Sequence, residues 1–518
     1  MPDAGKFFAM AEPVRDTRML AGIAAAAVAL GVTQLVAVVF GPQSDARTAV
    51  GSAVIDLTPG PVKEWAIQNF GTADKLFLSI LVVGVIALVA AVTARWETPR
   101  IPVGSIAIVV AGFLGCLAVL SRADATTVDI VPVIVGTVCG VAVLRLLTSG
   151  RLTDESETAG TPDRARRLSL ITLGFIGVGA LGGVAGVVLT RLLSSVSGDR
   201  DTFALPAVGV AAPPVPPTVQ PKGVALPSFV TPNADFYRID TALSVPQLSR
   251  ADWQLKIHGM VDREITYRFD DLNRFQAVQK LVTLTCVSNP VGGDLISNAT
   301  WTGYRVRDLL AEAGVHPDAD MVLSMSIDGF TAGTPIEALT DKRDALLAVG
   351  MNGEPLPTAH GYPARLVVPG LYGYVSATKW VVDIELTRFD RAEAYWTRLG
   401  WSPRGPIKTE SRIDVPQDGQ EVSQGPVTFG GVAWAQQRGV RAVEVRIDDG
   451  DWRQADLGAA YSNDTWRLWS FAWQATQPGS HTITVRATDN TGAVQTPDEA
   501  SPVPDGATGW HTVSFSVA

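Results

Sequence analysis

Five long apolar runs in the first 192 residues constrain the fold more than any other feature of this sequence. A helix rises about 1.5 Å per residue, so about 20 residues cross the hydrocarbon core of a bilayer. The runs have this length, and we expect membrane-spanning helices near 19–40, 76–94, 101–121, 126–147 and 168–190. Buried helices of a soluble protein are the alternative. A cleaved signal peptide explains at most one run, so the series favours a membrane anchor over 1–192.

Composition separates this apolar part from the remainder of the chain. The mean hydropathy is +0.21 although 18% of the residues are charged. Together these values indicate an apolar anchor joined to ordinary globular domains. A formal net charge of -9 disfavours a nucleic-acid partner. Three cysteines are too few for a disulfide scaffold.

Lysine and arginine are concentrated on one side of the expected spans, in the short flanks that determine topology. They lie before the first span, between the second and third, and between the fourth and fifth: Lys6, Arg15, Arg18, Arg95, Arg100, Arg145, Arg151, Arg164, Arg166 and Arg167. This distribution predicts a cytoplasmic N-terminus and places everything after Arg191 outside the cytoplasm. The pair Arg166-Arg167 is equally consistent with an internal twin-arginine export signal.

All five histidines of the chain lie beyond the expected spans. A membrane b-type haem usually has axial histidine ligands, so we predict no haem. The spans are therefore expected to anchor the chain in lipid, with a surface for an electron partner such as a quinone or a redox protein.

The remaining chain divides into three segments. Residues 193–224 are proline-rich, which predicts an extended, semi-rigid linker. Residues 225–402 combine β-prone runs with a helix expected over 306–313, which predicts an α+β domain. Residues 403–518 show strands alone, separated by turn residues, which predicts an immunoglobulin-like sandwich without a cysteine pair.

Cys286 is the cysteine on which chemistry in the exported half depends. Cys116 and Cys139 lie in expected spans and are interpreted as small apolar residues. Cys286 follows a β-prone strand and begins the loop 287–293. A thiolate there is a nucleophile or a metal ligand, and an inert buried thiol is the equally weighted alternative. One soft thiolate suits a metal whose other donors come from its own cofactor, such as molybdenum in a pyranopterin dithiolene.

Three motifs in the exported half resemble those of the sulfite oxidase family of molybdopterin enzymes. They are a cysteine motif over 283–289 (TLTCVSN) with Gly292-Gly293 and Trp301-Thr302-Gly303, an entry motif over 231–238 (TPNADFYR), and a pterin-phosphate motif over 360–370 (HGYPARLVVPG) with Lys379-Trp380. The sandwich is also similar to the domain that this family places after its molybdenum domain, often at a homodimer interface. The resemblance covers about Pro227 to the C-terminus and implies a molybdenum–molybdopterin cofactor.

The resemblance implies a role for each matching residue. Cys286 is implied to be the metal ligand, and Arg238 a contact for an anionic ligand at the catalytic centre. The implied cofactor-binding residues are Asn233, Phe236, Tyr237, Asp328, His360, Arg365, Ala377, Thr378 and Lys379. A dianionic phosphate needs fixed cationic donors, and arginine offers a bidentate fork. Four histidines match no motif and are interpreted as structural: His258, His316, His481 and His511.

Two departures from the family pattern bear on the substrate. Sulfite oxidases have arginines shortly after the cysteine, where this sequence has Asn289, Pro290 and Val291, and the family's tyrosine near the end of the domain has no match at 399–401. The pattern is closer to the periplasmic reductases that act on methionine sulfoxide. We therefore expect a multi-pass membrane oxidoreductase whose extracytoplasmic domains transfer an oxygen atom to or from a small molecule or sulfoxide. A sulfite-type oxidase and a non-catalytic adhesion module are the alternatives.

Overall fold

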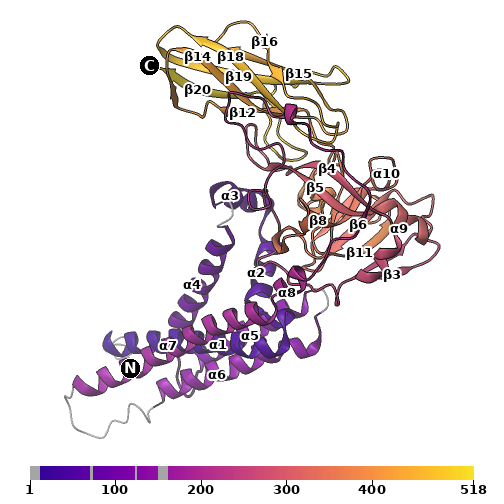
Figure 1. Cartoon of the computed structure of the whole chain (residues 1–518). Coiled ribbons are helices and arrows are strands. Elements are labelled where there is room, and N and C mark those ends of the chain that lie inside the picture. Colours follow the sequence, from indigo (N-terminus) through magenta and orange to yellow (C-terminus); the bar gives the residue numbers. More distant parts are fainter. Residues whose placement is uncertain (1–11, 71–73, 123–124, 150–161) are drawn as a thin grey trace. The chain divides into compact units, whose positions relative to one another are not determined.

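The computed structural model describes residues 12–70, 74–122, 125–149 and 162–518. It contains two compact units, which can be followed in Figure 1 by the colours that mark residue number. The helical unit consists of the first 195 residues with 242–244, and the β-rich unit consists of the remainder. The basic flank residues Lys6 and Arg151 lie outside the described residues.

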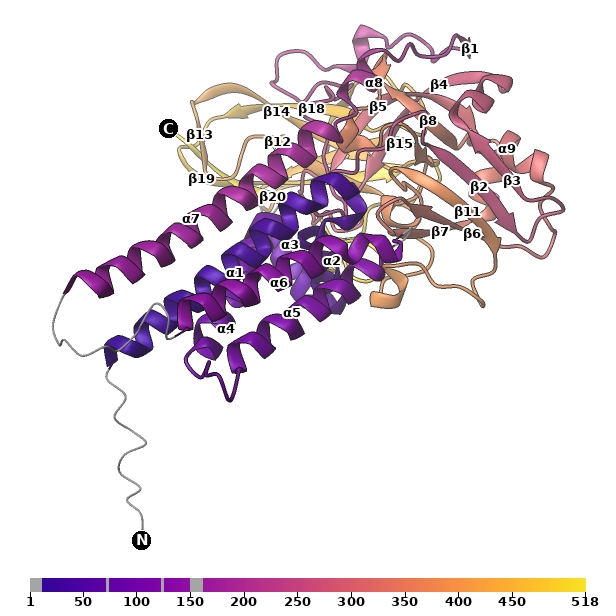
Figure 2. The same cartoon turned by 90° about the horizontal axis from the view of Figure 1, so that it is seen from below.

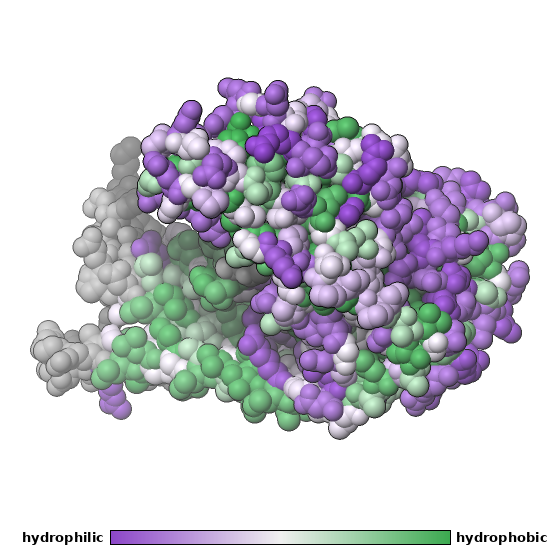
Figure 3. Space-filling view, turned by 45° about the horizontal axis from the view of Figure 1, so that its top comes forward, coloured by the Kyte–Doolittle hydropathy of each residue, from purple (hydrophilic) through white to green (hydrophobic). Residues whose placement is uncertain are grey.

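The described part of the helical unit contains five helices that are long and apolar enough to cross a membrane, as predicted. They are α1 (Glu12–Phe40), α4 (Asp74–Ala94), α5 (Val103–Leu120), α6 (Val131–Thr148) and α7 (Pro162–Leu193). Helix α1 packs against α4, α6 and α7, and Figure 2 shows α1, α6 and α7 running side by side. Apolar side chains cover much of the surface of this unit in Figure 3. Exposed examples are Leu76, Ile80, Leu88, Phe113 and Leu181.

Glycines bring α1 close to its neighbours. A Cβ atom at Gly31 would lie 2.2 Å from the Gly179 carbonyl oxygen of α7, and one at Gly22 would lie 2.3 Å from the Ala90 carbonyl oxygen of α4. Small residues thus set the helix separation, as they do in many membrane bundles. Only part of the glycine-rich face of α7 is used in this way, since a Cβ at Gly177 would meet open space among the described residues.

Two short helices that the sequence did not predict lie between α1 and α4: α2 (Ala46–Leu57) and α3 (Gly60–Phe70). Asp45 caps α2, and its carboxylate accepts hydrogen bonds from the backbone N–H groups of Arg47 at 3.1 Å and Thr48 at 3.4 Å. The Thr48 hydroxyl donates to the same carboxylate at 2.6 Å. The cap satisfies the first N–H groups of a helix that is too short to be recognised by its hydropathy.

Two sheets and three short α-helices form the first part of the β-rich unit. The order of the first sheet is β1-β4-β5-β8-β10, with β9 beside β8, and that of the second is β3-β2-β11-β6-β7. The first sheet consists of β1 (Val208–Val210), β4 (Ala277–Thr285), β5 (Ile296–Arg305), β8 (Leu346–Met351), β9 (Glu354–Pro355) and β10 (Arg365–Val367). The second consists of β2 (Gln254–Gly259), β3 (Ile265–Arg268), β6 (Met321–Ser326), β7 (Thr331–Pro335) and β11 (Val381–Thr387). The helices are α8 (Ser197–Asp201), α9 (Val306–Ala313) and α10 (Ile336–Thr340).

Local sequence signals explain these elements. Leu255 and Ile257 alternate with exposed or half-buried residues along β2 and are fully buried. Helix α9 ends as predicted at Gly314, whose φ is +71°. Asn352 and Gly353, with φ of +51° and +83°, form the turn between β8 and β9.

The proline-rich segment 193–224 differs from the predicted extended linker, since residues 197–201 form helix α8 and the part that follows is not a free linker. Val208 and Val210 pair in parallel with the start of β4. Val219 is buried in the main core of the unit. Farther along the segment, the carbonyl oxygens of Pro213 and Thr218 accept hydrogen bonds from the sandwich. The segment therefore belongs to the β-rich unit, because Val219 buries apolar surface there while Val208 and Val210, which are not buried, are held by strand pairing.

The C-terminal part is a sandwich of two sheets, as the alternating strands predicted. The sheet orders are β12-β14-β18-β17 and β13-β20-β19-β15-β16. The strands are β12 (Glu410–Val415), β13 (Gln420–Val422), β14 (Gly425–Trp434), β15 (Val440–Ile447), β16 (Arg453–Gln454), β17 (Asp456–Leu457), β18 (Arg467–Ala475), β19 (Gly479–Asp489) and β20 (His511–Val517). Phe429, Trp469 and Val485 are among its core residues. Apolar packing of the two inner faces stabilises the sandwich.

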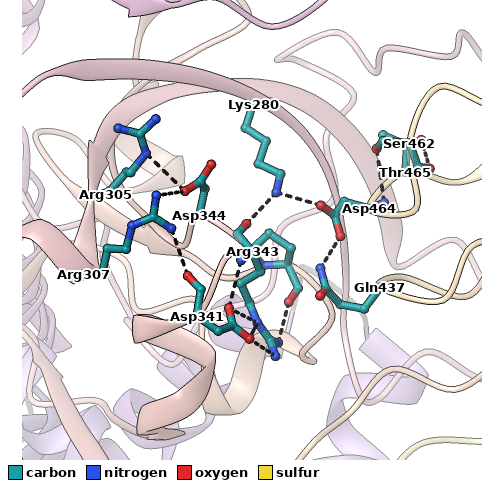
Figure 4. Close-up of polar contacts among 11 residues, drawn as sticks. Lys280, Arg305, Arg307, Asp341, Arg343, Asp344, Gln437, Ser462, Asp464 and Thr465 are labelled. Carbon is teal, nitrogen blue, oxygen red and sulfur yellow. Dashed lines mark hydrogen bonds and ion pairs between the residues drawn. The ribbon is translucent and has the colours of Figure 1, made fainter.

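The sandwich and the preceding α+β part share buried contacts. Trp434 and Trp466 of the sandwich belong to the same apolar cluster as Leu281 and Val287. Figure 4 shows the polar side of this junction, where the Lys280 ammonium of β4 lies 2.8 Å from an Asp464 carboxylate oxygen. The strand that leads to Cys286 is therefore in direct contact with the sandwich.

Candidate functional site

Cys286 follows the last residue of β4 and opens a tight loop. Its backbone N–H donates to the Leu295 carbonyl at 2.9 Å, and its own carbonyl accepts from the Asn289 N–H at 3.2 Å. Burial raises the pKa of the Cys286 thiol. The Ser288 hydroxyl, whose oxygen lies 2.9 Å from Sγ, opposes this effect. The thiol is thus held at a fixed position, and a cation would have to favour its ionised form.

Aromatic side chains lie beside the cysteine. Phe236 and Tyr237 stack with ring centroids 5.4 Å apart, and Phe236 also meets Trp301 and His360 edge to face. Burial raises the pKa of the Tyr237 phenol, and the charge of Cys286 adds to this effect. These contacts bring two of the three motifs and Trp301 of the third into one site.

Four basic side chains lie in the same region, and two of them bond to one carboxylate, that of Asp240. Asp240 Oδ2 accepts from Lys379 Nζ at 2.7 Å and from Arg238 Nε at 2.8 Å. Arg365 donates to the His360 carbonyl at 3.1 Å, and its guanidinium lies 5.0 Å from the centroid of the Trp301 ring. Arg238 is the most exposed of the four, whereas His360, Arg365 and Lys379 are buried.

Burial and mutual repulsion depress the pKa values of these groups. The pKa of Arg365 is lowered to about 10 by burial, and burial also lowers the pKa of Lys379 to about 8, against the attraction of Asp240. Burial, followed by the charges of Arg365 and Lys379, lowers the pKa of His360 to about 3. Positive charge therefore exceeds negative charge in this site, and a bound anion would restore the balance.

A glycine allows the basic side chains to approach one another. Gly361 has a φ of +112°, and a Cβ there would lie 2.9 Å from Arg365 Cβ and 3.2 Å from Lys379 Cβ. A side chain at this position would be strained in its backbone and would also push into both cationic residues. Because Gly361 has no side chain, the space beside Arg365 and Lys379 thus stays free.

The other predicted contacts lie nearby, with different roles in the fold. Asn233 accepts from the Asn352 amide at 2.8 Å, and a hydrogen bond joins its backbone to His360. Asp328 accepts from the Phe330 N–H at 3.3 Å, which places it in the turn after β6. The Ala377 carbonyl accepts from Arg365 at 3.4 Å. The Thr378 hydroxyl bonds to the Ser324 hydroxyl at 2.7 Å, and its carbonyl accepts from the Leu366 N–H at 2.9 Å.

Sequence reasoning missed Asp240 and the participation of Trp301 in cation binding. Asp240 lies two residues beyond Arg238 in an extended segment, so both side chains project from one side. That spacing was the available signal. The four histidines outside the motifs bond as structural residues do, for example His258 to Asp383 at 3.0 Å and His511 to the Ile413 N–H at 3.0 Å.

The positions that replace the family's arginines form an uncharged loop. Asn289 is buried and accepts from the Leu295 N–H at 2.9 Å through its side-chain oxygen. Its side-chain nitrogen has no hydrogen-bond partner among the described residues. Trp401, in place of the family's tyrosine, is buried against Tyr374 with ring centroids 5.8 Å apart.

The donor set fits a ligand that combines a soft metal with a phosphate. Cys286 offers one sulfur ligand, and Asn289 offers a buried amide donor that has no acceptor among the described residues. In the basic cluster, the single carboxylate of Asp240 is shared by Lys379 and Arg238, which leaves the charge of Arg365 unbalanced. Arginine and lysine are the usual donors to phosphate. A pterin carrying both a metal and a phosphate satisfies each of these requirements.

Comparison with known proteins points the same way. Residues 242–396 match the family described as "Oxidoreductase molybdopterin binding domain", and residues 410–485 match "Bacterial Ig domain". Mitochondrial sulfite oxidase of Mus musculus is 30% identical over 342 residues, which cover 56% of this chain and 62% of that protein. The uncharacterized oxidoreductase YuiH of Bacillus subtilis is 33% identical over 153 residues, which cover 30% of this chain and 74% of that protein.

One solved structure aligns with a similar share of this chain. The sulfane dehydrogenase SoxCD from Paracoccus pantotrophus is 24% identical and aligns with a TM-score of 0.49, over 57% of this chain and 82% of that chain. The present chain thus spans somewhat less than two thirds of the mitochondrial relatives, and its helical unit lies outside the matched families.

Proposed function

Because this chain belongs to the sulfite oxidase family of molybdopterin oxidoreductases, we propose that it is a membrane-anchored, extracytoplasmic molybdenum enzyme that moves an oxygen atom to or from a small neutral molecule such as a sulfoxide. The observation that carries the proposal is the pair of buried cations Arg365 and Lys379, which lie with the neutral His360 in the same site as the Cys286 thiol. A structural role alone does not account for burying so many cations around one carboxylate.

Different residues would hold different parts of the cofactor. Cys286 would ligate the metal, and the electron density donated by its thiolate would tune the redox properties of the metal. Arg365 and Lys379 would hold the phosphate, with His360 as a neutral donor at physiological pH because its pKa lies far below 7. Asn233, Phe236 and Tyr237 would line the pterin, with Asp328 and the backbone of Ala377 and Thr378 around it. When bound, molybdenum supplies the two-electron redox change.

The substrate is proposed to be neutral because the loop after Cys286 carries no charge at positions 289–291. Asn289, Pro290 and Val291 carry no charge where sulfite oxidases have arginines, and Trp401 is apolar. Arg238 is the remaining cation at the half-exposed edge, and its guanidinium is already bonded to Asp240 at 2.8 Å. A sulfite dianion would find little compensation there, whereas a sulfoxide oxygen needs only hydrogen-bond donors such as Arg238.

The anchor and its orientation rest on the five apolar helices and on the basic flanks. Electrons would pass to or from a quinone or a redox protein at the membrane, and the sandwich would offer a surface for a homodimer. A C-terminal fusion to alkaline phosphatase, which is active only outside the cytoplasm, tests the sidedness. An inactive phosphatase, with a cytoplasmic reporter active at the same site, would reverse the topology.

Metal content and turnover test the catalytic proposal. The full chain is produced in a molybdopterin-competent host, and molybdenum, pterin and activity are measured for the wild type and for Cys286→Ala. The matched control is Cys116→Ala/Cys139→Ala, which removes the two cysteines of the helical unit. Cys286→Ala should abolish turnover and keep the pterin, while the control keeps both. Wild-type protein without molybdenum or pterin would sink the proposal.

The substrate is tested on the same protein with a dye as electron partner. The panel contains sulfite, dimethyl sulfoxide, methionine sulfoxide and an amine N-oxide. Turnover of sulfoxides or N-oxides without sulfite oxidation is expected. Preferential oxidation of sulfite would contradict the neutral substrate and establish a sulfite-type oxidase.

A further inference from the structure

The C-terminal sandwich holds the segment that carries Cys286 along its whole length, from Lys280 to Gly293. We infer that the sandwich is part of the metal site, and that Arg412 is a positioning residue that fixes the cysteine loop. This inference rests on the proposed role of Cys286 as the metal ligand. It assigns to the sandwich a task that association between copies or adhesion would not require.

The strand before the cysteine is bonded to the sandwich on the edge opposite β5. The Thr283 N–H donates to the Asp464 carbonyl at 2.9 Å, and the Thr283 hydroxyl accepts from the Trp466 N–H at 2.8 Å. The Gln436 amide donates to the Thr285 hydroxyl at 3.1 Å. These bonds take the place of a neighbouring strand at the end of β4, immediately before Cys286.

One charged group anchors this part of the junction. Lys280 lies 2.8 Å from Asp464 and also donates to the Arg343 carbonyl, while Gln437 donates to Asp464 (Figure 4). Asp464 is therefore fixed by a side chain from each side of the junction. Its carbonyl, which accepts from Thr283, is fixed with it.

The loop after the cysteine is held by two strands of the sandwich. Arg412 of β12 donates to the Gly293 carbonyl at 2.8 Å, and its Nε donates to Asp414 at 2.7 Å, which fixes the guanidinium. His511 of β20 packs on Gly292: a Cβ there would lie 2.3 Å from two atoms of the imidazole ring. The ring itself is held by the Ile413 N–H.

The loop is short and internally bonded, so its far end determines the position of Cys286. Gly293 donates to the Pro290 carbonyl at 2.9 Å, and the Leu295 carbonyl accepts from the Cys286 N–H at 2.9 Å. The Asn289 side chain ties Leu295 back to the loop at 2.9 Å. Releasing Gly293 from Arg412 thus loosens the bonds that orient the thiol. Hydrogen bonds from charged donors are the stronger ones, which makes Arg412 the member to test.

The first measurement uses the full chain purified without cofactor, so that it does not depend on turnover. Cys286 alkylation by iodoacetamide is followed by peptide mass spectrometry, which separates it from Cys116 and Cys139. Arg412→Gln should raise the rate about tenfold or more, because local opening exposes more of the half-buried thiol. Arg412→Gln/Asp414→Asn removes the same bond without leaving a buried carboxylate unpaired, and it should give the same increase.

The control is Arg486→Gln, another sandwich arginine that bonds to Glu444 at 2.9 Å and, among the described residues, to none of the α+β part. It should alkylate at the wild-type rate. The second measurement is the electron paramagnetic resonance spectrum of the molybdenum-loaded enzyme, which should change in both Arg412 variants and not in the control. Thermal denaturation shows whether each variant is folded.

The outcomes separate this inference from the proposed function. Folded Arg412 variants that alkylate at the wild-type rate and leave the spectrum unchanged would overturn the positioning role, even if the wild type contains molybdenum. An equal increase for Arg486→Gln would overturn it as well, since general loosening of the sandwich would then be the cause. Absence of molybdenum from the wild type would overturn the proposed function instead.

Discussion

Lys379 Nζ donates to Asp240 Oδ2 at 2.7 Å, and the two side chains are only 9% and 5% exposed. The same oxygen accepts from Arg238 Nε at 2.8 Å. One carboxylate therefore serves two cations while Arg365 lies buried beside them. This imbalance identifies the place where an anion is needed and leads to the first prediction.

Asp240→Asn should destabilise the cofactor-free protein by about 3–5 kcal/mol, because it leaves a buried ammonium without its partner. Inorganic phosphate should then raise the midpoint of thermal denaturation more in the variant than in the wild type, since it replaces the lost negative charge. Differential scanning fluorimetry measures both effects. Asp505→Asn removes the exposed partner of Lys408 and should change little. An Asp240 variant that phosphate stabilises no more than the wild type would contradict an anion site.

Gly361→Ala should lower the bound molybdopterin content severalfold. The new Cβ would meet Arg365 and Lys379, and the φ of +112° is unfavourable for alanine. Gly353→Ala is the matched control, because Gly353 has a φ of +83° but open space around its Cβ position among the described residues. Pterin fluorescence after oxidation measures the content. Equal losses in the two variants would mean that backbone strain, and not contact of the new Cβ with Arg365 and Lys379, is responsible.

The acid stability of the protein should depend on His511. Burial, followed by the charge of Arg412, lowers the pKa of His511 to about 4, whereas an unfolded histidine titrates near 6.5. The unfolded state therefore binds more protons between these values, so stability falls as the pH drops from about 6.5 towards about 4.

His511→Asn keeps an acceptor for the Ile413 N–H and should remove on the order of 2–3 kcal/mol of this pH-dependent loss. Thermal denaturation at about pH 7.5 and about pH 4.5 gives the difference. His316→Asn is the control, since His316 is half exposed and lies 4.0 Å from Asp318. A variant as acid-sensitive as the wild type would show that other groups cause the loss.

Gly31→Val should disrupt the helical unit, because its side chain would collide with the Gly179 backbone of α7. Gly177→Val, on the other face of α7, should be tolerated. Size-exclusion chromatography and thermal aggregation of the full chain in detergent compare the two. A Gly31 variant as stable as the Gly177 variant would mean that α1 and α7 do not depend on close packing.

Much of the fold could be predicted because its signals are local. Long apolar runs identify the five helices, and period-two alternation identifies strands such as β2 and β15. The pairing of Val208 and Val210 with β4 and the burial of Val219 could not be predicted, since a proline-rich segment has the composition of a free linker and its partner strand lies far away in the sequence. The cap of α2 by Asp45 was likewise hidden, because short helices depend on side-chain hydrogen bonds more than on periodicity.

The candidate site divides in the same way. Cys286, His360, Arg365 and Lys379 stand in recognisable motifs, each with the chemistry expected of a thiolate ligand or a phosphate donor. Asp240 was missed because a carboxylate near an arginine is common in any sequence. The contacts of Arg412 and His511 with the cysteine loop involve residues more than 100 positions away, and no local pattern connects them.

The sequence by itself determined the apolar helices, the strand pattern and the residue types available for chemistry, because hydrophobic periodicity and side-chain reactivity are properties of the chain. Only the tertiary structure decided which cations are buried together, which carboxylate they share and that the sandwich holds the cysteine loop. Those features depend on distances between segments far apart in sequence, and charge and desolvation act through such distances.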